Sequence, residues 1–468
     1  MMKRIGLLSL LFVFTFMSVF TFNVSTTQAN FEPQVETAIL VDADTGKILL
    51  EKNVDQPLPP ASMTKMMAEY LILEAVHNGQ ITWDQAVPIP DYLARMSHNQ
   101  SLSNVMLRTD ETYTVKELYE SVAIYSANAS TMALAELIAG SYGNFVKMMN
   151  DKGKELGLGT PLREAGAQYG MDDLEEIAEA GLGDFQFVNS TGLPNHLLDG
   201  YHAEGTGANE DNYMSARASA ILAFHLINDF PEVLDTASIP EKIFKEGTED
   251  AITMQNWNKM LVGTTYSDWD YEPIDGLKTG FTSAAGFCFT GTAERDGQRL
   301  ISVVMKAESE GQRFQETRRL MEYGFNNFSK QEIFPAGMEL EGYETIPVTR
   351  GKADEVSIST AESVSSLVHW DDEDAYSYSV QLDESLLDEQ GRLIAPIEAN
   401  QVIGTMTVEY IGAGEENYIQ GDGLRSVDII TNEAVEEAGW FSLMFQGIGE
   451  FFSGIWGSVA DAVRGLFN

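Results

Sequence analysis

Apolar residues along this chain follow helical spacing in some segments and strand-like runs in others. Residues 66 to 79 carry apolar side chains at helical spacing and end at a glycine, which predicts a helix. Residues 316 to 328 show the same spacing, and we expect this second helix to close the first domain. Apolar runs around short turns predict two hairpins, formed by residues 38–41 with 47–50 and by residues 287–293 with 299–305.

The pattern changes after about residue 334. Up to residue 431 the chain shows short alternating runs separated by turn residues, at 345–349, 356–360, 377–382 and 402–410. This pattern predicts a small all-β sandwich. Because 468 residues exceed a single core of ordinary size, we divide the chain into a first domain at 30–333 and a β-sandwich domain at 334–431.

The N-terminus has the pattern of a signal peptide. Lys3 and Arg4 precede an uncharged apolar run from residue 5 to residue 22, and Thr27-Gln28-Ala29 offers small residues for cleavage. We therefore expect residues 1–29 to be removed from a secreted protein. A retained membrane anchor is the alternative.

The C-terminal segment, residues 432–468, predicts an amphipathic helix. From residue 441 to residue 466 apolar side chains recur at three- and four-residue spacing opposite a polar face. Glu450, Asp461 and Arg464 interrupt any run that could span a membrane, so we expect this helix to lie in the membrane interface. The protein would then sit peripherally on the outer face of the cytoplasmic membrane. A helix docked on its own domain or on a partner is the alternative.

The charge balance argues against one class of partner. The chain has 29 Lys+Arg against 71 Asp+Glu, a formal net charge of −42. Nucleic-acid binding needs clustered cations, so we expect no nucleic-acid partner. Dense acidity indicates a protein that works in salt, where screening shortens the range of self-repulsion. Ordinary acidic drift is the alternative.

The sequence gives little indication of a metal site or of a catalytic thiol. The six histidines show no clustered ligand spacing, so we predict no metal site and no cofactor. Cys288 is the single cysteine and lies in an expected strand. We interpret it as a buried core thiol rather than a catalytic one.

Three short strings carry the strongest chemical signal. In chain order they are Ser62-Met63-Thr64-Lys65, Ser126-Ala127-Asn128 and Lys278-Thr279-Gly280. This order of S-x-x-K, S-x-N and K-T-G is typical of penicillin-binding proteins and class A β-lactamases. A serine hydroxyl needs an adjacent base to act as a nucleophile, and Ser62 and Lys65 share one helix face at i and i+3.

Lys65 can serve as that base only as a neutral amine. Burial and the nearby cation of Lys278 both favour the neutral form. Ser126 can then pass the proton onward, while Asn128 holds either Lys65 or a substrate amide. The alternative for Ser62 is a structural role as the N-cap of the helix that follows it.

From about residue 31 to the C-terminus, the chain resembles the low-molecular-mass penicillin-binding proteins, which are serine D-alanyl-D-alanine carboxypeptidases. The resemblance is carried by residues 61–67, 125–130, 187–193, 275–280 and Arg313-Phe314. It implies an α+β, β-lactamase-like catalytic domain with an antiparallel sheet flanked by helices. It also implies a peptidoglycan stem peptide ending in D-Ala-D-Ala as the substrate, and β-lactam antibiotics as inhibitors.

The resemblance assigns further roles. It implies that the backbone N–H groups of Ser62 and Phe281 form the oxyanion hole, and that Thr279 and Arg313 hold the terminal carboxylate of the substrate. Phe281 departs from the family, where histidine or tyrosine is common. A surface arginine on a helix is the alternative for Arg313. The predicted site comprises Ser62, Lys65 and Ser126 as catalytic residues and Asn128, Lys278, Thr279, Gly280, Phe281 and Arg313 as substrate-binding residues.

One acidic segment departs from the family. About two dozen extra residues are expected between Gly159 and Gln186, and they include Asp172, Asp173 and Glu175. A β-lactamase would place its deacylating glutamate in this neighbourhood. We interpret the segment as an acidic surface excursion, with a catalytic carboxylate as the alternative.

The sequence thus predicts a D-alanyl-D-alanine carboxypeptidase that acts through an acyl-enzyme on Ser62. A β-lactamase or D,D-endopeptidase on the same fold is the nearest alternative. A catalytically idle peptidoglycan-binding protein is an alternative from another class, and the presence of every motif residue argues against it.

Overall fold

The structure is a computed structural model that describes residues 31–439 except 371, 373–374, 413–414 and 422–424. The expected signal peptide and most of the expected C-terminal helical segment therefore lie outside the described residues. The chain divides into two compact units, residues 1–32 and 33–468, and the elements below belong to the second. None of the helices in the described ranges is long and apolar enough to cross a membrane.

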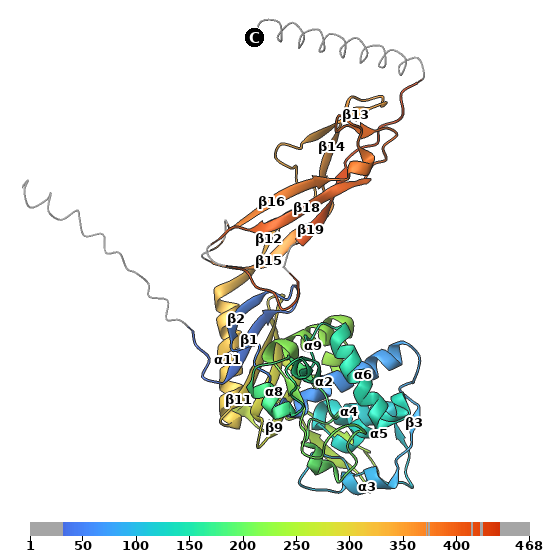
Figure 1. Ribbon diagram of the computed structural model, residues 1–468, viewed down its shortest axis with the longest axis vertical. Coiled ribbons are helices and arrows are strands. Elements are labelled where there is room, and N and C mark those ends of the chain that lie inside the picture. The colour runs from blue at the N-terminus through green and yellow to red at the C-terminus, as the bar shows by residue number, and fades with distance from the viewer. Residues whose placement is uncertain (1–30, 371, 373–374, 413–414, 422–424, 440–468) are drawn as a thin grey trace, which may run out of the picture. The chain divides into compact units, whose positions relative to one another are not determined.

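The N-terminal part of the second unit is built around a five-stranded antiparallel sheet (Figure 1). Its strands, in spatial order, are β2 (Ile48–Lys52), β1 (Thr37–Asp42), β11 (Gln298–Ala307), β10 (Gly286–Arg295) and β9 (Ile274–Thr282). Both predicted hairpins are confirmed, since β1 pairs with β2 and β10 with β11. In the second turn Asp296 and Gly297 have φ of 53° and 78°, as a type I′ turn requires.

Helices cover both faces of this sheet. The helices of this part are η1 (Ala61–Thr64), α2 (Lys65–His77), α3 (Asp91–Ser97), α4 (Val115–Tyr125), α5 (Asn128–Ala139), α6 (Tyr142–Glu155), α7 (Leu162–Ala167), α8 (Leu174–Glu179), η2 (Asn195–Leu198), α9 (Ala216–Asp229), α10 (Val233–Ala237), η3 (Ser267–Trp269) and α11 (Glu310–Asn327). Three short strand pairs lie among them: β3 (Ala86–Val87) with β4 (Tyr113–Thr114), β5 (Phe185–Gln186) with β6 (Tyr213–Met214), and β7 (Glu241–Phe244) with β8 (Ile252–Gln255). Figure 1 shows α11 on one side of the sheet and α9 and α2 on the other.

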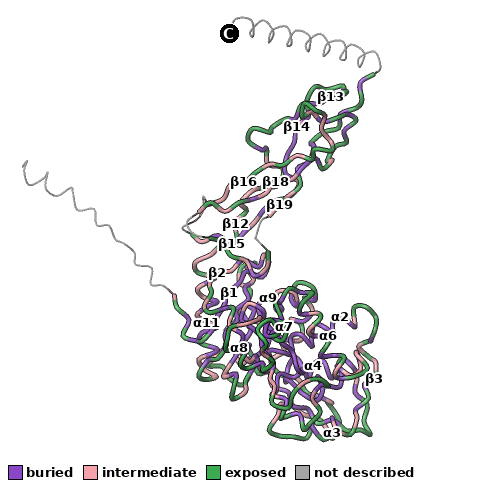
Figure 2. Tube along the Cα trace, in the orientation of Figure 1, coloured by how far each residue is buried: buried purple, intermediate pink, exposed green. Residues whose placement is uncertain are grey.

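The two helices expected from apolar spacing are both present. The first is α2, and it is followed by Gly79 with φ of 70°. Nearly all side chains of α2 are buried in the main core cluster, so it is the central helix of this part. Figure 2 shows buried (purple) segments among the helices of this part and exposed (green) loops at its edge. The second is α11, which begins earlier than expected. Ser309 caps it by accepting a hydrogen bond from the backbone N–H of Gln312.

The C-terminal part is all β-structure apart from one short helix, within the described residues. A two-stranded sheet pairs β12 (Phe328–Phe334) with β15 (Val364–His369). A six-stranded sheet has the order β16 (Tyr376–Leu382), β18 (Val402–Tyr410), β19 (Arg425–Thr431), β14 (Glu355–Thr360), β13 (Thr345–Thr349) and β17 (Leu393–Ile394), and η4 (Glu384–Leu386) follows β16. Four of these strands match the predicted alternating runs. Buried apolar residues from the large sheet form a core of their own.

The acidic segment between residues 159 and 186 folds into α7 and α8. Leu162, Leu174 and Ile177 are buried and belong to a small separate cluster. Asp172 and Asp173 are exposed, and Asp173 caps α8 by accepting from two backbone N–H groups. The acidic side chains of residues 164–179 therefore face solvent, whereas Asp184 is half-buried and accepts from the backbone N–H of Thr160 at 2.7 Å. The surface interpretation is confirmed, and a catalytic carboxylate in this segment is not found among the residues that line the site.

Cys288 lies in β10 and is fully buried, as expected for a core thiol. Burial raises the pKa of this thiol to about 11. A thiol with a raised pKa is a poor nucleophile at neutral pH.

Candidate active site

Ser62 and Lys65 face each other at the junction of two helical segments. Ser62 lies in η1, and Lys65 is the first residue of α2. The Nζ of Lys65 is 3.1 Å from the Oγ of Ser62. The N-cap alternative for Ser62 is wrong, because Pro60 and Thr64 occupy the N-cap positions of the two segments and neither cap uses the Ser62 side chain. The hydroxyl of Ser62 is thus available for chemistry.

The amine of Lys65 is buried and has two further partners. Its Nζ is 2.8 Å from Oδ1 of Asn128 and 2.5 Å from the backbone O of Thr191. Burial, and then the positive charge of Lys278, hold the pKa of Lys65 well below its ordinary value. As a neutral amine Lys65 can donate to these two oxygens and still accept the proton of Ser62 with its lone pair.

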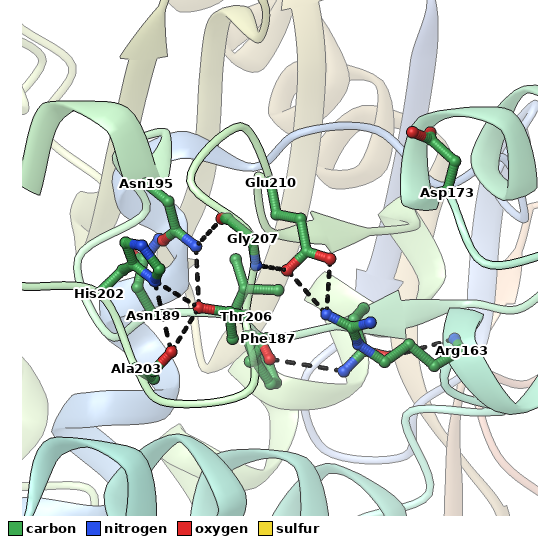
Figure 3. A network of polar contacts seen from close by, with 12 residues as sticks. Arg163, Asp173, Phe187, Asn189, Asn195, His202, Ala203, Thr206, Gly207 and Glu210 are labelled. Carbon is green, nitrogen blue, oxygen red and sulfur yellow. Dashed lines mark hydrogen bonds and ion pairs between the residues drawn. The ribbon is translucent and has the colours of Figure 1, made fainter. Parts of the chain in front are cut away.

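Thr191 lies in residues 187–193, one of the strings that carry the family resemblance. Asn189 is fully buried, and its Oδ1 accepts from the backbone N–H of Thr191 at 3.0 Å and of Gly192 at 2.8 Å. Asn189 also donates to Oδ1 of Asn195 at 2.9 Å. Figure 3 shows the polar network beyond this contact, in which Asn195 donates to the backbone O of Gly207 and Arg163 pairs with Glu210. Asp173 lies on its own helix apart from that network. The hydrogen bonds of Asn189 to Thr191 and Gly192 hold the loop in which the Thr191 carbonyl accepts from Lys65.

The S-x-N string spans the break between α4 and α5. Ser126 ends α4 with φ of 61°, in the left-handed region, and Asn128 begins α5. The Oγ of Ser126 is buried and has no hydrogen-bond partner within the described residues. The side-chain amide of Asn128 donates to the backbone O of Ser103 at 2.9 Å, which directs its Oδ1 to Lys65.

The K-T-G string lies on the edge strand β9. A Cβ placed on Gly280 would be 2.5 Å from the backbone O of Pro60. Glycine therefore lets β9 approach the segment that carries Ser62. Lys278 is buried in the same strand, and its Nζ donates to the backbone O of Thr279 at 3.2 Å. Burial lowers the pKa of Lys278 to about 8, although the carboxylate of Glu69 opposes this.

Arg313 is buried beside the K-T-G strand, so its interpretation as a surface helix arginine is wrong. Its side chain is 3% exposed. Nη1 donates to the backbone O of Gly280 at 3.2 Å, and Nη2 lies 3.2 Å from Oε1 of Glu310. The guanidinium also lies 5.5 Å from the ring centre of Phe287. These contacts hold the guanidinium of Arg313 in place beside the K-T-G strand.

A cavity of about 300 Å³ opens between these elements. It is lined by Ser62, Ser101, Leu102, Ser103, Ser126, Asn128, Leu193, Trp257, Thr279, Gly280, Phe281, Phe287, Glu310 and Arg313. Phe281 is 53% exposed, and its ring stacks on Phe287 with centres 4.3 Å apart. Of the predicted residues, Lys65 and Lys278 do not line the cavity, and they lie buried behind it.

Several lining residues lie outside the motif strings. Ser101, Leu102 and Ser103 come from the stretch before α4, Trp257 from the stretch after β8, and Glu310 from the start of α11. No local pattern marks them, because only the tertiary fold brings these stretches to one cavity. Leu193 lies in a string that carried the family resemblance.

Two family models match the chain. The model described as D-alanyl-D-alanine carboxypeptidase matches residues 23–162 and 171–309. The model described as the C-terminal domain of penicillin-binding protein 5 matches residues 328–437. The first match skips only residues 163–170 of the acidic segment, so the unmatched part is shorter than the two dozen residues expected.

Curated relatives carry the same description. The chain is 26% identical over 419 residues to the D-alanyl-D-alanine carboxypeptidase DacF of Bacillus subtilis, covering 89% of this chain and 90% of that protein. It is 31% identical over 335 residues to DacA of Haemophilus influenzae, covering 70% and 72%.

Solved structures agree. A peptidoglycan synthesis regulatory factor (PBP3) from Streptococcus pneumoniae has a TM-score of 0.68 and 32% identity, covering 86% of this chain and all of that one. Penicillin binding protein 5 from Haemophilus influenzae has a TM-score of 0.61 and 26% identity, covering 87% and 99%. The chain therefore belongs to the D-alanyl-D-alanine carboxypeptidase family of serine peptidases.

Proposed function

We propose that Ser62 is the nucleophile of this carboxypeptidase and that Lys65 is its general base. The observation that carries the proposal is the 3.1 Å contact between Lys65 Nζ and Ser62 Oγ, in a setting that lowers the pKa of the lysine. Ser62 Oγ bonds to the carbonyl carbon of the penultimate D-Ala while its proton passes to Lys65. The C–N bond to the terminal D-Ala then breaks.

Ser126 completes the proton path. Its hydroxyl lines the cavity with Ser62 and passes the proton from Lys65 to the leaving amine of D-Ala. Water then attacks the acyl carbon, and the O–C bond to Ser62 breaks with return of the proton to the serine. Asn128 holds Lys65 in place through its Oδ1 throughout this sequence.

The substrate is a peptidoglycan stem peptide that ends in D-Ala-D-Ala. Arg313 and Thr279 line one side of the cavity, where a cation and a hydroxyl suit the terminal carboxylate. The backbone N–H groups of Ser62 and Phe281 receive the oxyanion, and both residues line the same cavity. A β-lactam acylates the same serine because it presents an acyl carbon and a carboxylate in a similar arrangement.

Mass spectrometry with penicillin and with a D-Ala-D-Ala peptide tests the proposal. Native protein should gain one acyl group at Ser62 that lasts for minutes or longer, and should release D-Ala from the peptide. The Ser62→Ala variant should do neither, and heat-unfolded native protein is the control for non-specific labelling. An adduct at another residue would refute the assignment, and rapid release of hydrolysed penicillin would favour a β-lactamase.

Cleavage of a peptide cross-link tests the endopeptidase alternative. That activity needs a leaving group larger than D-Ala, and the same incubation with a cross-linked stem peptide reports it. A protein that is acylated neither by penicillin nor by the D-Ala-D-Ala peptide would be the catalytically idle peptidoglycan-binding protein.

We also propose that residues 1–29 are a signal peptide and that residues 432–468 attach the protein peripherally to the membrane. The β-sandwich at 334–431 would then separate the catalytic domain at 30–333 from the membrane. Truncation after Ala438 should release an enzyme that still binds penicillin. Vesicle co-sedimentation of both forms across a salt series tests this, since burial of apolar residues survives high salt and electrostatic attachment does not. Equal sedimentation of the two forms would exclude the tail as the anchor.

A further inference from the structure

Glu69 is a buried carboxylate next to the catalytic dyad that the reaction scheme above does not use. It is 3% exposed, and its Oε1 has no hydrogen-bond partner within the described residues. It follows Lys65 by four positions on α2, so the two share one helix face. Helical side chains lean toward the N-terminus, which directs the carboxylate of Glu69 toward the turn that carries Lys65.

Two lysines supply the charges that Glu69 meets. Lys65 lies on the same helix, and Lys278 lies on β9, which packs against α2. Tyr119 of α4 lies near Glu69 as well, and its hydroxyl is buried without a described partner.

Charged groups on the other helices around α2 contact residues of α2 other than Glu69. Lys152 of α6 pairs with Glu74 at 2.8 Å, and Asp229 of α9 accepts from the hydroxyl of Tyr70 at 2.9 Å. The part of α5 nearest Lys65 contributes the neutral amide of Asn128. Among the described residues, the site around Glu69 therefore holds one carboxylate, the amines of Lys65 and Lys278 and the phenol of Tyr119. The positive charge of Arg313 acts on Lys278 as well and lowers its pKa.

The hydrogen bonds divide the charge between these two amines. Lys65 has two oxygen acceptors and one hydroxyl, which suits a neutral amine with two N–H groups and one lone pair. Two neighbouring buried ammonium groups would repel each other, so the positive charge belongs on Lys278. A buried ammonium is stable only with a compensating negative charge.

We propose that Glu69 is a positioning residue whose carboxylate is the counter-charge of Lys278, so that Lys278 stays an ammonium while Lys65 stays a neutral base. Burial raises the pKa of Glu69, and the positive charges of Lys278 and Lys65 oppose this rise and favour the carboxylate. This inference rests on the proposed roles of Ser62 and Lys65.

The test is the pH profile of Ser62 acylation by penicillin. Its acid limb reports loss of the Lys65 proton. We assign its alkaline limb to loss of the Lys278 proton, because Lys278 is a predicted substrate-binding residue whose ammonium would attract the carboxylate of penicillin. The carboxylate of Glu69 raises the pKa of both lysines. Glu69→Gln should therefore move both limbs to lower pH, by about one unit. Acylation at pH 9 should then fall about tenfold while acylation at pH 6 is maintained or increased.

Three further variants make the result specific. Glu69→Leu removes the same charge without leaving an unpaired polar group, so it gives the readout should Glu69→Gln fail to fold. Glu69→Asp keeps the charge and should keep both limbs. Glu316→Gln makes the same change at an equally buried carboxylate, on α11, and should also keep both limbs.

The inference would be overturned if Glu69→Gln left both limbs of the pH profile in place, or if it lowered the acylation rate equally at all pH values. Equal shifts of the limbs in Glu316→Gln would also overturn it. The proposed function fails separately, if Ser62→Ala still takes the label. If native protein is labelled at Ser62 but Glu69→Gln leaves both limbs in place, only the role of Glu69 is refuted and the proposed function stands.

Discussion

Gly192 packs directly against Ala61, the residue before the proposed nucleophile. A Cβ on Gly192 would lie 1.8 Å from the backbone O of Ala61, and Gly192 has φ of 77°. The loop that presents the Thr191 carbonyl to Lys65 thus contacts the backbone of η1 without any side chain between them. A side chain at position 192 would therefore push η1, and Ser62 with it, away from this loop.

Gly192→Ala should therefore damage both stability and catalysis. The left-handed backbone alone costs roughly 1–2 kcal/mol for a residue with a Cβ, and the clash adds to this. We expect a lower melting temperature and at least about a tenfold slower acylation by penicillin, which corresponds to a barrier higher by about 1.4 kcal/mol. Both are measured on the purified variant.

Gly140→Ala is the matched control. Gly140 has φ of 73°, but a Cβ there would have nothing within 4 Å. It should lose stability from the backbone strain and keep the acylation rate. Equal loss of acylation in the two variants would show that close packing at Gly192 is not what positions Ser62.

Lys65→Arg should abolish the base while keeping the positive charge. A guanidinium does not lose its proton in proteins, so it cannot accept the proton of Ser62. Acylation should slow by about a hundredfold or more, the usual contribution of a positioned general base. Time-resolved mass spectrometry measures the rate, with the exposed Lys116→Arg as control. Acylation at a near-native rate in Lys65→Arg would assign the base to another group.

Arg313→Ala should weaken recognition of the substrate carboxylate. A hydrogen bond to a charged group contributes about 1.5–3 kcal/mol, so kcat/KM for a D-Ala-D-Ala peptide should fall roughly tenfold to hundredfold. The comparison substrate is the same peptide with its C-terminal carboxylate amidated, for which the loss should be much smaller. Arg313→Lys keeps the positive charge but lacks the planar guanidinium, so its kcat/KM for the D-Ala-D-Ala peptide should lie between those of native protein and Arg313→Ala. Equal losses on both peptides would mean that Arg313 acts through its bond to Gly280 instead.

Asp211 should make the folded protein less stable as the pH rises. Burial raises the pKa of this carboxyl from 3.8 to about 7, so the folded form keeps a proton that the unfolded chain has already lost. Its contribution to stability is therefore lost as the pH rises between these two values. Asp211→Asn removes this effect and can still accept from the backbone N–H of Asn212, which Asp211 holds at 2.8 Å.

The melting temperature of Asp211→Asn relative to native protein should therefore be higher at pH 8 than at pH 5. Thermal scans at both pH values measure this difference. Asp172→Asn, at an exposed carboxylate, should show no such change. A constant difference between Asp211→Asn and native protein would mean that Asp211 is ionised in the folded state at both pH values.

Much of the fold follows from local patterns. The hairpin around Asp296-Gly297 was predictable because the turn residues suit its backbone and the flanking runs are apolar. The start of α11 was not, because the polar cap at Ser309 precedes the apolar spacing by several residues. The acidic segment was correctly expected at the surface, since its charges could not be buried without partners.

By itself, the sequence determined the chemistry of the site, since the order of the three motif strings names a serine, its lysine base and a second lysine. Only the tertiary structure decided that the Thr191 carbonyl binds Lys65, that Arg313 is buried, and that Glu69 is buried within the influence of both lysine charges. Lys65 and Thr191 are 126 positions apart, and no local spacing encodes such a contact. Packing of β9 and the Asn189 loop against α2 and η1 creates it, because burial and charge depend on what surrounds a side chain in space.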